Sequence, residues 1–212
     1  MDEFINVIIN IINQNDNTIN IRISGHGASG KSTFANKLIK VLEENTYNLL
    51  ETDPYIIDNG IRELATAQYE YKGELYNEKI TGCMPLAHEL NSLKRDILAL
   101  SAGIDMITID EPWAPSVKLQ GNKHINIYEG LRLYFLEKDL FDISITFKCD
   151  EKTELSTRLE RDVTIRGSNS EYVMSSQSIQ RRQYEHFMLP LESEFDYVIN
   201  TSNDKFIMEK TK

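Results

Sequence analysis

The sequence has little cysteine and no excess of positive charge, and each shortage argues against a class of protein. Only two cysteines occur, Cys83 and Cys149, in separate regions and without metal-ligand spacing around them. Reduced thiols in the cytoplasm are therefore expected, rather than a disulfide framework or a zinc site. Lysine and arginine total 23 against 33 aspartate and glutamate, a net charge of −10. Such a chain attracts neither nucleic acid nor an anionic membrane surface, so any phosphate recognition must be local.

A long hydrophobic run is also lacking. The chain begins with an apolar stretch, but Asp2 and Glu3 stand where a secretory signal would be basic, and no small-residue cleavage site follows. The stretch is too short to span a bilayer, so no membrane partner is expected. Its apolar residues recur at helical spacing, which predicts an amphipathic helix and a turn over residues 1–17. These apolar residues are Phe4, Ile5, Ile8, Ile9 and Ile12.

The rest of the chain alternates between short β-rich runs and helical periods. Its length of 212 residues suits a single compact domain, residues 1–212, and its 41% hydrophobic content suits a soluble globular protein. Strands are predicted at residues 18–24, 48–52, 104–109, 124–128, 143–149 and 197–200, and helices at 31–44, 85–102, 151–166 and 176–192. Residues 55–81 show no firm period and are expected to be irregular or partly helical. This order predicts an α/β fold, a three-layer sandwich with a mainly parallel sheet and helices on both faces.

A glycine-rich loop follows the first predicted strand and opens the first long helix. It fits G-x-x-x-x-G-K-[ST] at every fixed position and in the context that this pattern requires. The glycines let backbone N–H groups turn toward phosphates, Lys31 supplies a cation, and the Ser32 hydroxyl suits Mg²⁺. We therefore expect ATP and Mg²⁺ as cofactors, bound by Gly25, His26, Gly27, Ala28, Ser29, Gly30, Lys31, Ser32 and Thr33. At His26 the backbone is expected to matter, not the side chain.

A phosphate loop alone does not separate kinases from GTPases or ATPases. Four stretches together resemble the uridine kinase and phosphoribulokinase-like family of P-loop kinases, over about residues 18–200: the phosphate loop, Thr52–Tyr55, Tyr128–Gly130, and Leu140–Asp142 leading to the spaced arginines of Arg158–Gly167. The resemblance implies a P-loop NTPase fold with a small β-hairpin at about 104–124 and an arginine-bearing lid at about 155–175. It also implies transfer of the γ-phosphate of ATP to a hydroxyl of a small molecule.

By this resemblance, Asp53 follows the second strand and faces the acceptor hydroxyl. A carboxylate there can orient the hydroxyl and accept its proton, and Lys31 can neutralise phosphate charge, so both are candidate catalytic residues. Asp53 is also a candidate ligand of Mg²⁺, together with Ser32. The alternative for Asp53 is an ordinary turn, since aspartate commonly opens turns.

The acid that binds Mg²⁺ has two candidates. By the resemblance, Glu129 ends a buried strand and holds the ion directly or through water. A hydrophobic run before Asp110 and Glu111 is also typical of ATPases that use an Asp-Glu pair for the metal and the attacking water. The resemblance instead assigns that run to a hairpin on the acceptor side. Glu129 is favoured, and Asp110 with Glu111 stays the alternative.

Arg158, Arg161 and Arg166 are the candidate lid arginines, and they are expected to take part in catalysis. Arg158 and Arg161 lie three residues apart on one face of the predicted helix. By the resemblance, their guanidinium groups neutralise the charge of the transferred phosphoryl group when the lid closes. The alternative is a set of surface ion pairs, because Glu154 and Asp162 each precede an arginine by four residues.

The acceptor pocket departs from that of uridine kinases. Uridine kinases have an acidic residue that binds the ribose and a histidine that recognises the base. Both are missing at the corresponding positions of this chain, Cys83–Pro85 and Asp110–Pro115. A nucleoside is the leading acceptor, but uridine itself is in question. The candidate substrate-binding residues are Tyr55, Cys83 and Trp113, and the two rings can stack on a base, although a lone Trp also serves in packing.

Two alternatives to a kinase stay open. One is a hydrolysing P-loop ATPase or GTPase, but the chain has no Asp-x-x-Gly, and Asn122–Ile125 lacks the aspartate that completes guanine recognition. The other is a non-catalytic ATP-binding regulator, because acceptor residues are lost. The identity of the acceptor, and whether the chain forms a homo-oligomer, are left open by the sequence.

Overall fold

The computed structural model describes residues 1–165, 167 and 169–210, so Arg166, one of the candidate lid arginines, lies outside the described residues. A π-helical turn, Leu159–Ile165, directly follows helix α5. In chain order the helices and strands are α1 (Asp2–Asn13), β1 (Ile19–Gly25), α2 (Lys31–Ile39), β2 (Tyr47–Glu51), α3 (Asn59–Arg62), β3 (Thr66–Tyr71), β4 (Glu74–Lys79), α4 (Leu90–Ser101), β5 (Met106–Ile107), β6 (Lys118–Leu119), β7 (Ile125–Glu129), β8 (Ile143–Lys148), α5 (Glu151–Arg158), α6 (Ser170–Gln183), β9 (Tyr197–Asn200) and β10 (Ile207–Lys210).

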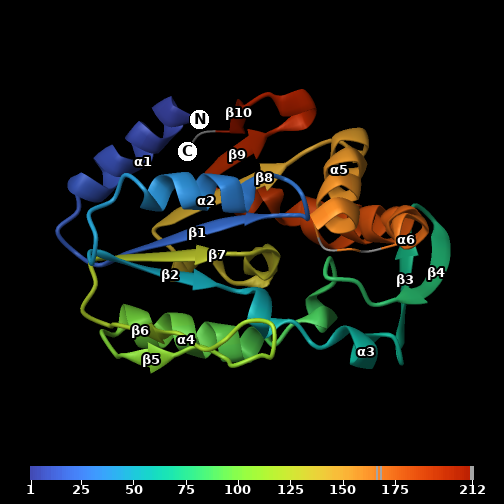
Figure 1. The fold of residues 1–212 in the computed structure, drawn as a ribbon, viewed down its shortest axis with the longest axis horizontal. Helices are drawn as coiled ribbons and strands as arrows, with labels where there is room; N and C mark the ends of the chain where they lie inside the picture. The colour runs from blue at the N-terminus through green and yellow to red at the C-terminus, as the bar shows by residue number, and fades with distance from the viewer. Residues whose placement is uncertain (166, 168, 211–212) are drawn as a thin grey trace.

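The central sheet is mainly parallel, as the sequence predicts. Within the described part of the chain it has six strands in the order β10-β9-β8-β1-β7-β2 (Figure 1). β1 pairs in parallel with β7 and β8, β2 with β7, and β9 with β8, whereas β10 is antiparallel to β9. The register sets Ile21 of β1 opposite Ile127 of β7 and Ile143 of β8.

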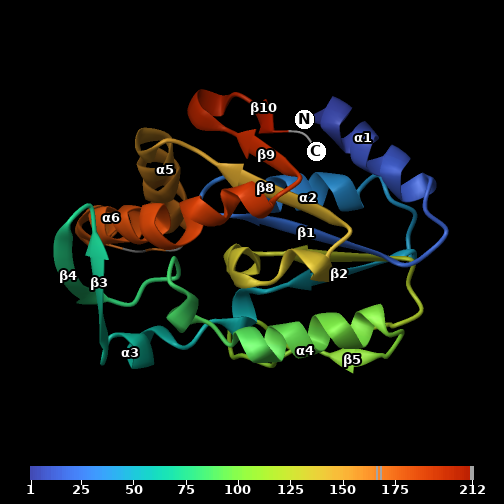
Figure 2. The ribbon, with the colours of Figure 1, turned by 180° about the vertical axis from the view of Figure 1, so that it is seen from behind.

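Alternating side chains along the strands divide the molecule into three layers. The isoleucines of β1, β7 and β8 pack with the apolar sides of α1 and α2 on one face of the sheet. On the other face, Leu50 and Tyr128 pack with α4 and with the turns that follow β7. Figure 2 shows the molecule from behind, where β8 passes in front of α2 and α4 lies below β2. Helices therefore cover both faces, and the predicted sandwich is confirmed.

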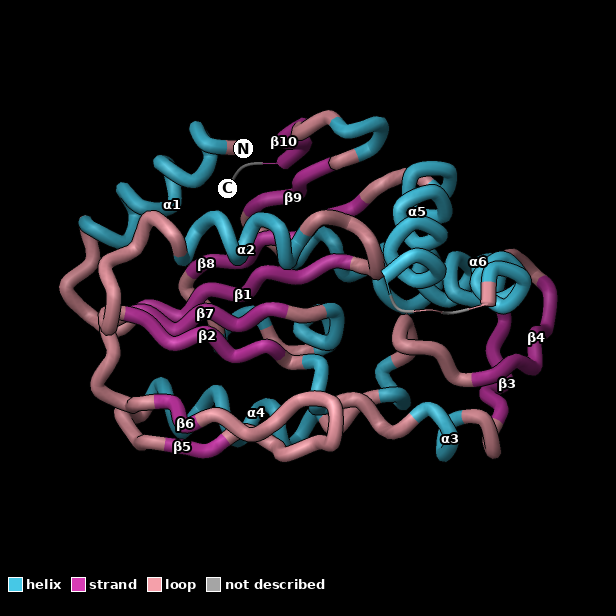
Figure 3. Tube along the Cα trace, viewed as in Figure 1, coloured by secondary structure: helices cyan, strands magenta, loops and turns pink. Residues whose placement is uncertain are grey.

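The carboxyl ends of the parallel strands point toward one end of the molecule. There β1 continues into the phosphate loop, β8 into α5, and β2 into the long segment that contains α3, β3 and β4 (Figure 3). The β3–β4 hairpin lies beside the end of α6, where Tyr71 donates a hydrogen bond to Glu185. Segments far apart in the sequence thus meet at this edge, which is where open α/β sheets bind ligands.

The expectation of irregular or partly helical structure at residues 55–81 is wrong for the β3–β4 hairpin. β3 and β4 pair antiparallel from Thr66 with Lys79 to Tyr71 with Glu74. The turn between them has positive φ at Lys72 and Gly73, 52° and 81°, which matches the twist of a tight hairpin. The hairpin depends on tertiary packing, because only Ala67 and Tyr69 of its strands are buried.

Several helix boundaries also differ from the prediction. The helix expected from residue 85 begins at Leu90, after a 3-10 turn at Pro85–Ala87. The helix expected at residues 151–166 is α-helical only as far as Arg158. α6 begins earlier than residue 176, at Ser170, because Asn169 caps it by accepting a hydrogen bond from the Glu171 N–H. Strand β10 was not expected.

The region 104–124 contains β5 and β6, which pair Met106 with Leu119 and Ile107 with Lys118. The β-rich run that follows belongs to the central sheet as β7. Among the described helices, none combines the length and the apolar character needed to cross a membrane.

Candidate active site

The phosphate loop joins β1 to α2, and its shape depends on Gly25. Gly25 has a φ of 149°, and a Cβ atom there would lie 2.4 Å from the Phe147 carbonyl oxygen and 2.5 Å from Ser29 Oγ. Only glycine permits this close approach of the loop to β8. Gly30, with a φ of 91°, then precedes Lys31, the first residue of α2. The first turn of α2 therefore carries Lys31 and Ser32 at the carboxyl end of β1.

Neighbouring elements hold the loop in place through His26 and Ser29. The N–H of Cys149 donates to His26 Nε2 at 3.0 Å, so the proton of this imidazole is on Nδ1 and donates to Gly27 O at 2.8 Å. Burial lowers the pKa of His26 to about 3, which keeps the ring neutral. Thr201 Oγ1 donates to Ser29 O at 3.0 Å. The His26 side chain thus supports the loop, in addition to the backbone role expected for this residue.

Ser32, Lys31 and Glu129 form a compact cluster. Ser32 Oγ donates to Glu129 Oε1 at 3.0 Å, and Lys31 Nζ lies 3.8 Å from the same oxygen. Glu129 is buried at the end of β7, and this burial raises the pKa of its carboxyl, while Lys31 and the Ser32 hydroxyl oppose the rise. A hydroxyl and a carboxylate so close together match the oxygen ligands that Mg²⁺ takes. The residues present therefore fit the ion.

The alternative acids, Asp110 and Glu111, lie in the loop of the β5–β6 hairpin. Asp110 Oδ1 accepts a hydrogen bond from the Ser116 N–H at 2.8 Å, and Glu111 forms a backbone bridge with Ala114. Both residues therefore stabilise the hairpin loop, whereas Glu129 adjoins the phosphate loop.

Asp53 follows β2 and opens a 3-10 turn. Its side chain is 65% exposed and accepts a hydrogen bond from Arg132 Nη1 at 2.8 Å. Arg132 is only 3% exposed. Its Nη1 also donates to Thr52 Oγ1 and its Nε donates to His88 Nδ1, both at 3.2 Å. A buried cation with fixed partners thus orients an exposed carboxylate.

His88 and Gly130 complete this support. Because a guanidinium group can only donate, His88 Nδ1 is an acceptor, and the proton on its Nε2 donates to Gly82 O at 2.8 Å. Burial, together with the Arg132 charge, lowers the pKa of His88 to about 3. Gly130 has a φ of 152°, and a Cβ atom there would lie 1.9 Å from Thr52 Oγ1. β7 therefore approaches the end of β2 only because this residue is glycine.

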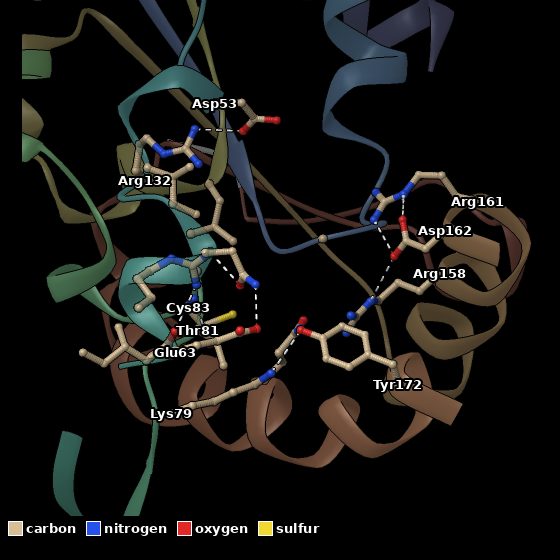
Figure 4. A pocket seen from close by; sticks show the side chains of 18 of the residues that line it. Asp53, Glu63, Lys79, Thr81, Cys83, Arg132, Arg158, Arg161, Asp162 and Tyr172 are labelled. Carbon is tan, nitrogen blue, oxygen red and sulfur yellow. Dashed lines mark hydrogen bonds and ion pairs between the residues drawn. The ribbon is translucent and has the colours of Figure 1, made fainter. Parts of the chain in front are cut away.

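Two cavities meet at Asp53, and Ser32 lines both of them. The lid cavity has a volume of about 350 Å³, and its walls include Lys31, Arg132, Arg158 and Arg161. The hairpin cavity has a volume of about 550 Å³, and its walls include Glu129 and the β5–β6 loop. Figure 4 shows Asp53 and Arg132 on one side of the lid cavity and Arg158, Arg161 and Asp162 across from them. A ligand in either cavity can therefore meet both Asp53 and the phosphate loop.

The two candidate lid arginines that the structure describes line the lid cavity and already have partners. Arg158 is buried, donates to Gln177 Oε1 at 2.8 Å, and lies 4.0 Å from Glu154 and 3.7 Å from Asp162. Arg161 is partly exposed and donates to Asp162 through Nε and Nη2, at 2.8 and 3.1 Å. Of the two ion pairs considered as an alternative, that of Glu154 with Arg158 is present and buried, and it does not remove Arg158 from the cavity wall. The pair of Asp162 with Arg166 lies outside the described residues.

The three substrate candidates lie in different surroundings. Tyr55 is fully buried and its hydroxyl donates to Asp96 Oδ2 at 2.6 Å, so the prediction that it contacts substrate is wrong. The turn after β2 directs this ring into the core beside α4. Cys83 lines the lid cavity, and burial raises the pKa of its thiol to about 12, which keeps it protonated. Trp113 is 58% exposed and lines the hairpin cavity.

Sequence reasoning missed Arg132, His88, Arg62 and Lys79, which line or support the lid cavity. A signal existed for Arg132, because a lone arginine inside the apolar run Leu131–Phe135 calls for a buried partner. Arg62 and Lys79 lie in the segment without a firm period, where no pattern indicates which residues face the site.

The matching family and three known proteins that this chain resembles are kinases by name. The family model described as the Phosphoribulokinase / Uridine kinase family matches residues 20–207. The chain is 22% identical to a phosphoribulokinase of Synechocystis sp., over 93% of this chain and 58% of that protein, and 27% identical to a uridine kinase of Staphylococcus epidermidis, over 87% and 88%. The chain thus spans less than two thirds of the length of that phosphoribulokinase. D-glycerate 3-kinase from Cryptococcus neoformans superposes with a TM-score of 0.66 at 10% identity, covering 99% of this chain and 98% of that one, a likeness of fold.

Proposed function

This chain belongs to the phosphoribulokinase / uridine kinase family of P-loop kinases, and from that premise we propose that it transfers the γ-phosphate of ATP to a hydroxyl group of a small molecule. The main observation in support is the exposed carboxylate of Asp53, held by Arg132 at the point where two cavities meet the phosphate loop. Nucleosides are the acceptors expected from the sequence, and the name of the uridine kinase relative supports testing them first.

Phosphoryl transfer needs alignment and charge neutralisation more than covalent chemistry. When bound, ATP supplies the phosphoryl group and Mg²⁺ neutralises charge on its phosphate oxygens. Ser32 and Glu129 would hold the metal, with Asp53 as a further candidate, and residues 25–33 would hold the phosphates. Lys31, Arg158 and Arg161 would offset the negative charge that spreads over the transferred group.

Asp53 would orient the acceptor hydroxyl and accept its proton. Its carboxylate is exposed, so an acceptor can reach it, and Arg132 prevents it from turning away. The buried thiols Cys83 and Cys149 stay protonated and take no part in the transfer, since burial raises the pKa of both to about 12. We expect the enzyme to act in the cytoplasm as a single domain.

The proposal is tested by ATP consumption with and without a panel of nucleosides, vitamins and sugar phosphates. We expect slow consumption alone and strong stimulation by one acceptor. Asp53→Asn should then lower kcat by about 100- to 10,000-fold, the usual loss when a general base is removed, with ATP affinity nearly unchanged. Asp139→Asn, at an exposed carboxylate outside both cavities, is the matched control. If no acceptor stimulates the reaction, a nucleotide hydrolase or a non-catalytic regulator is the better description.

A further inference from the structure

The lid cavity is positively charged although the protein is acidic. Among the described residues, six basic side chains line it: Lys31, Arg62, Lys79, Arg132, Arg158 and Arg161. Three acidic side chains line it as well, and these are Asp53, Glu63 and Asp162. The whole chain carries a net charge of −10, so this cavity collects positive charge against the overall trend. Positive charge that is concentrated in a cavity in this way attracts anions.

The acids of the cavity neutralise only part of this charge. Asp53 pairs with Arg132, and Asp162 pairs with Arg158 and Arg161. Glu63 instead accepts a hydrogen bond from the Asn59 side chain at 2.7 Å. In the part of the chain that the structure describes, no carboxylate forms an ion pair with Arg62 or with Lys79. Among the described residues, these two are therefore the cations of the cavity without a direct ion pair.

Arg62 is held in place by neutral groups. Its Nε donates to Ile57 O at 2.7 Å, its Nη1 to Ile80 O at 3.0 Å, and its Nη2 to Asn59 Oδ1 at 3.3 Å. Since a guanidinium group has five N–H donors, one donor on each terminal nitrogen is left for a ligand. Burial lowers the pKa of Arg62, with a smaller contribution in the same direction from the positive charge of Arg132, whereas Tyr172, Asp58 and Glu63 oppose the fall. The guanidinium group is thus held in place by neutral hydrogen-bond acceptors, and its acidic neighbours act on it without a direct ion pair.

Lys79 occupies a similar position on the neighbouring strand. It ends β4, and its Nζ donates to the Tyr172 hydroxyl of α6 at 3.1 Å and lies 4.7 Å from the centre of that ring. Figure 4 shows Lys79 and Tyr172 at the end of the lid cavity away from Asp53. Arg62 and Lys79 come from the segment between β2 and α4, whereas the cations expected to serve ATP come from α2 and from the α5 region. Their charge is therefore separate from that of the cations expected to serve ATP.

We propose that the acceptor carries an anionic group, a phosphate monoester or a carboxylate, which binds between Arg62 and Lys79 while its hydroxyl faces Asp53. This inference rests on the proposed kinase activity, and it favours anionic acceptors over the neutral nucleosides expected from the sequence. A planar guanidinium with two spare donors and an adjacent ammonium match the oxygens of either group. A neutral nucleoside would leave both cations without a directly paired counter-charge in a partly dehydrated cavity.

The test is a set of matched acceptors, each offered as the phosphate monoester, the carboxylate and the neutral parent alcohol, at saturating ATP and Mg²⁺. We expect the preferred acceptor to be anionic, and the comparison of the two anionic arms tells phosphate from carboxylate. Arg62→Gln should raise the KM for it by about 10- to 100-fold, since a charged hydrogen-bond partner is lost, with a smaller effect on kcat. Lys79→Met, at a side chain without backbone hydrogen bonds, should act in the same direction.

Lys72→Gln is the matched control, because Lys72 lies at the exposed turn of the same hairpin and does not line the cavity. The inference is overturned if the neutral alcohol is preferred, or if Arg62→Gln leaves the KM of the anionic acceptor unchanged.

A binding experiment separates this inference from the proposed function. The protein is saturated with a non-hydrolysable ATP analogue and Mg²⁺, which fills the phosphate loop, and is then titrated with inorganic phosphate. We expect binding to the wild type and to Lys72→Gln, and at least tenfold weaker binding to Arg62→Gln. This result supports the anion site even if no acceptor stimulates ATP consumption. Equal affinity of the wild type and Arg62→Gln overturns it.

Discussion

At the scale of single residues, the position of the Asp53 carboxylate depends on Arg132. The guanidinium group is buried, and Thr52, Asp53 and His88 take its hydrogen bonds. His88 is neutral, because burial lowers its pKa to about 3, so it accepts from Arg132 without adding a charge. The Asp53 carboxylate is thus oriented by residues that need not contact a bound acceptor.

Arg132→Gln is expected to lower kcat about tenfold or more with little change in the KM for ATP, because Asp53 loses its charged hydrogen-bond donor. The decisive measurement is a double-mutant cycle with Asp53→Asn. If Arg132 acts through Asp53, the second substitution adds little to the loss caused by the first. Fully additive losses would contradict this role. Lys94→Gln, at a surface pair with Glu137, is the control.

At the scale of elements, the lid segment differs most from a regular helix. α5 ends at Arg158 and a π-helical turn follows, Leu159–Ile165. Such turns change the direction of side chains relative to a continuous α-helix and are frequent at functional sites. Here Arg158 is buried against Gln177 and Glu154, whereas Arg161 is partly exposed and bonds only its neighbour Asp162 among the described residues. We therefore expect the two arginines to have different roles.

Arg161→Ala is expected to lower kcat more than it raises the KM for ATP, with little loss of stability. Arg158→Ala should lower both kcat and stability, because the buried Gln177 Oε1 loses its donor, whereas Glu154 keeps Arg181 as a partner. A buried acceptor without its hydrogen bond costs about 1 to 3 kcal/mol, so the free energy of unfolding measured in urea should fall by about that amount. Equal stability of the two variants would mean that Arg158 has no structural role.

At the scale of the whole molecule, two neutral histidines connect the site to the stability of the domain. His26 supports the phosphate loop and His88 supports Arg132, and burial lowers the pKa of each to about 3. In the unfolded chain both take up protons below about pH 6.5. The unfolded state therefore binds more protons than the folded state between pH 6.5 and pH 3, so stability falls as the pH falls through this window. Glu129 and Glu154 oppose the effect, because burial raises the pKa of both.

The free energy of unfolding should thus drop by about 1.4 kcal/mol per histidine for each pH unit below 6.5. Urea unfolding at pH 7.5 and pH 5.5 measures the drop. The double variant His26→Gln with His88→Gln should show a clearly smaller pH dependence, while His124→Gln, at a residue outside this buried pair, should match the wild type. If the wild type and both variants showed the same pH dependence, His26 and His88 would not be its cause.

Local sequence patterns alone determine the fold class of this protein and several positions of its candidate site. The alternation of strands and helices, the phosphate loop, and the places of Asp53 and Glu129 at strand ends depend on spacing along the chain. Side-chain periods of 2 and 3.6 and the chemistry of glycine suffice for these features. The sequence by itself therefore determined the fold class and the position of the phosphate loop.

Only the tertiary structure decided which other side chains reach the site. Tyr55 is buried although it adjoins Asp53, and Arg132 reaches Asp53 across 79 positions of the chain. Lys79 lines the lid cavity because the β3–β4 hairpin folds back against α6, and Arg62 lines it because its guanidinium group bonds Ile80 O, next to that hairpin. Their placement results from contacts between distant segments, and a local pattern carries no information about such contacts. The charge of the acceptor pocket, and with it the inferred acceptor, is therefore a property of the folded chain.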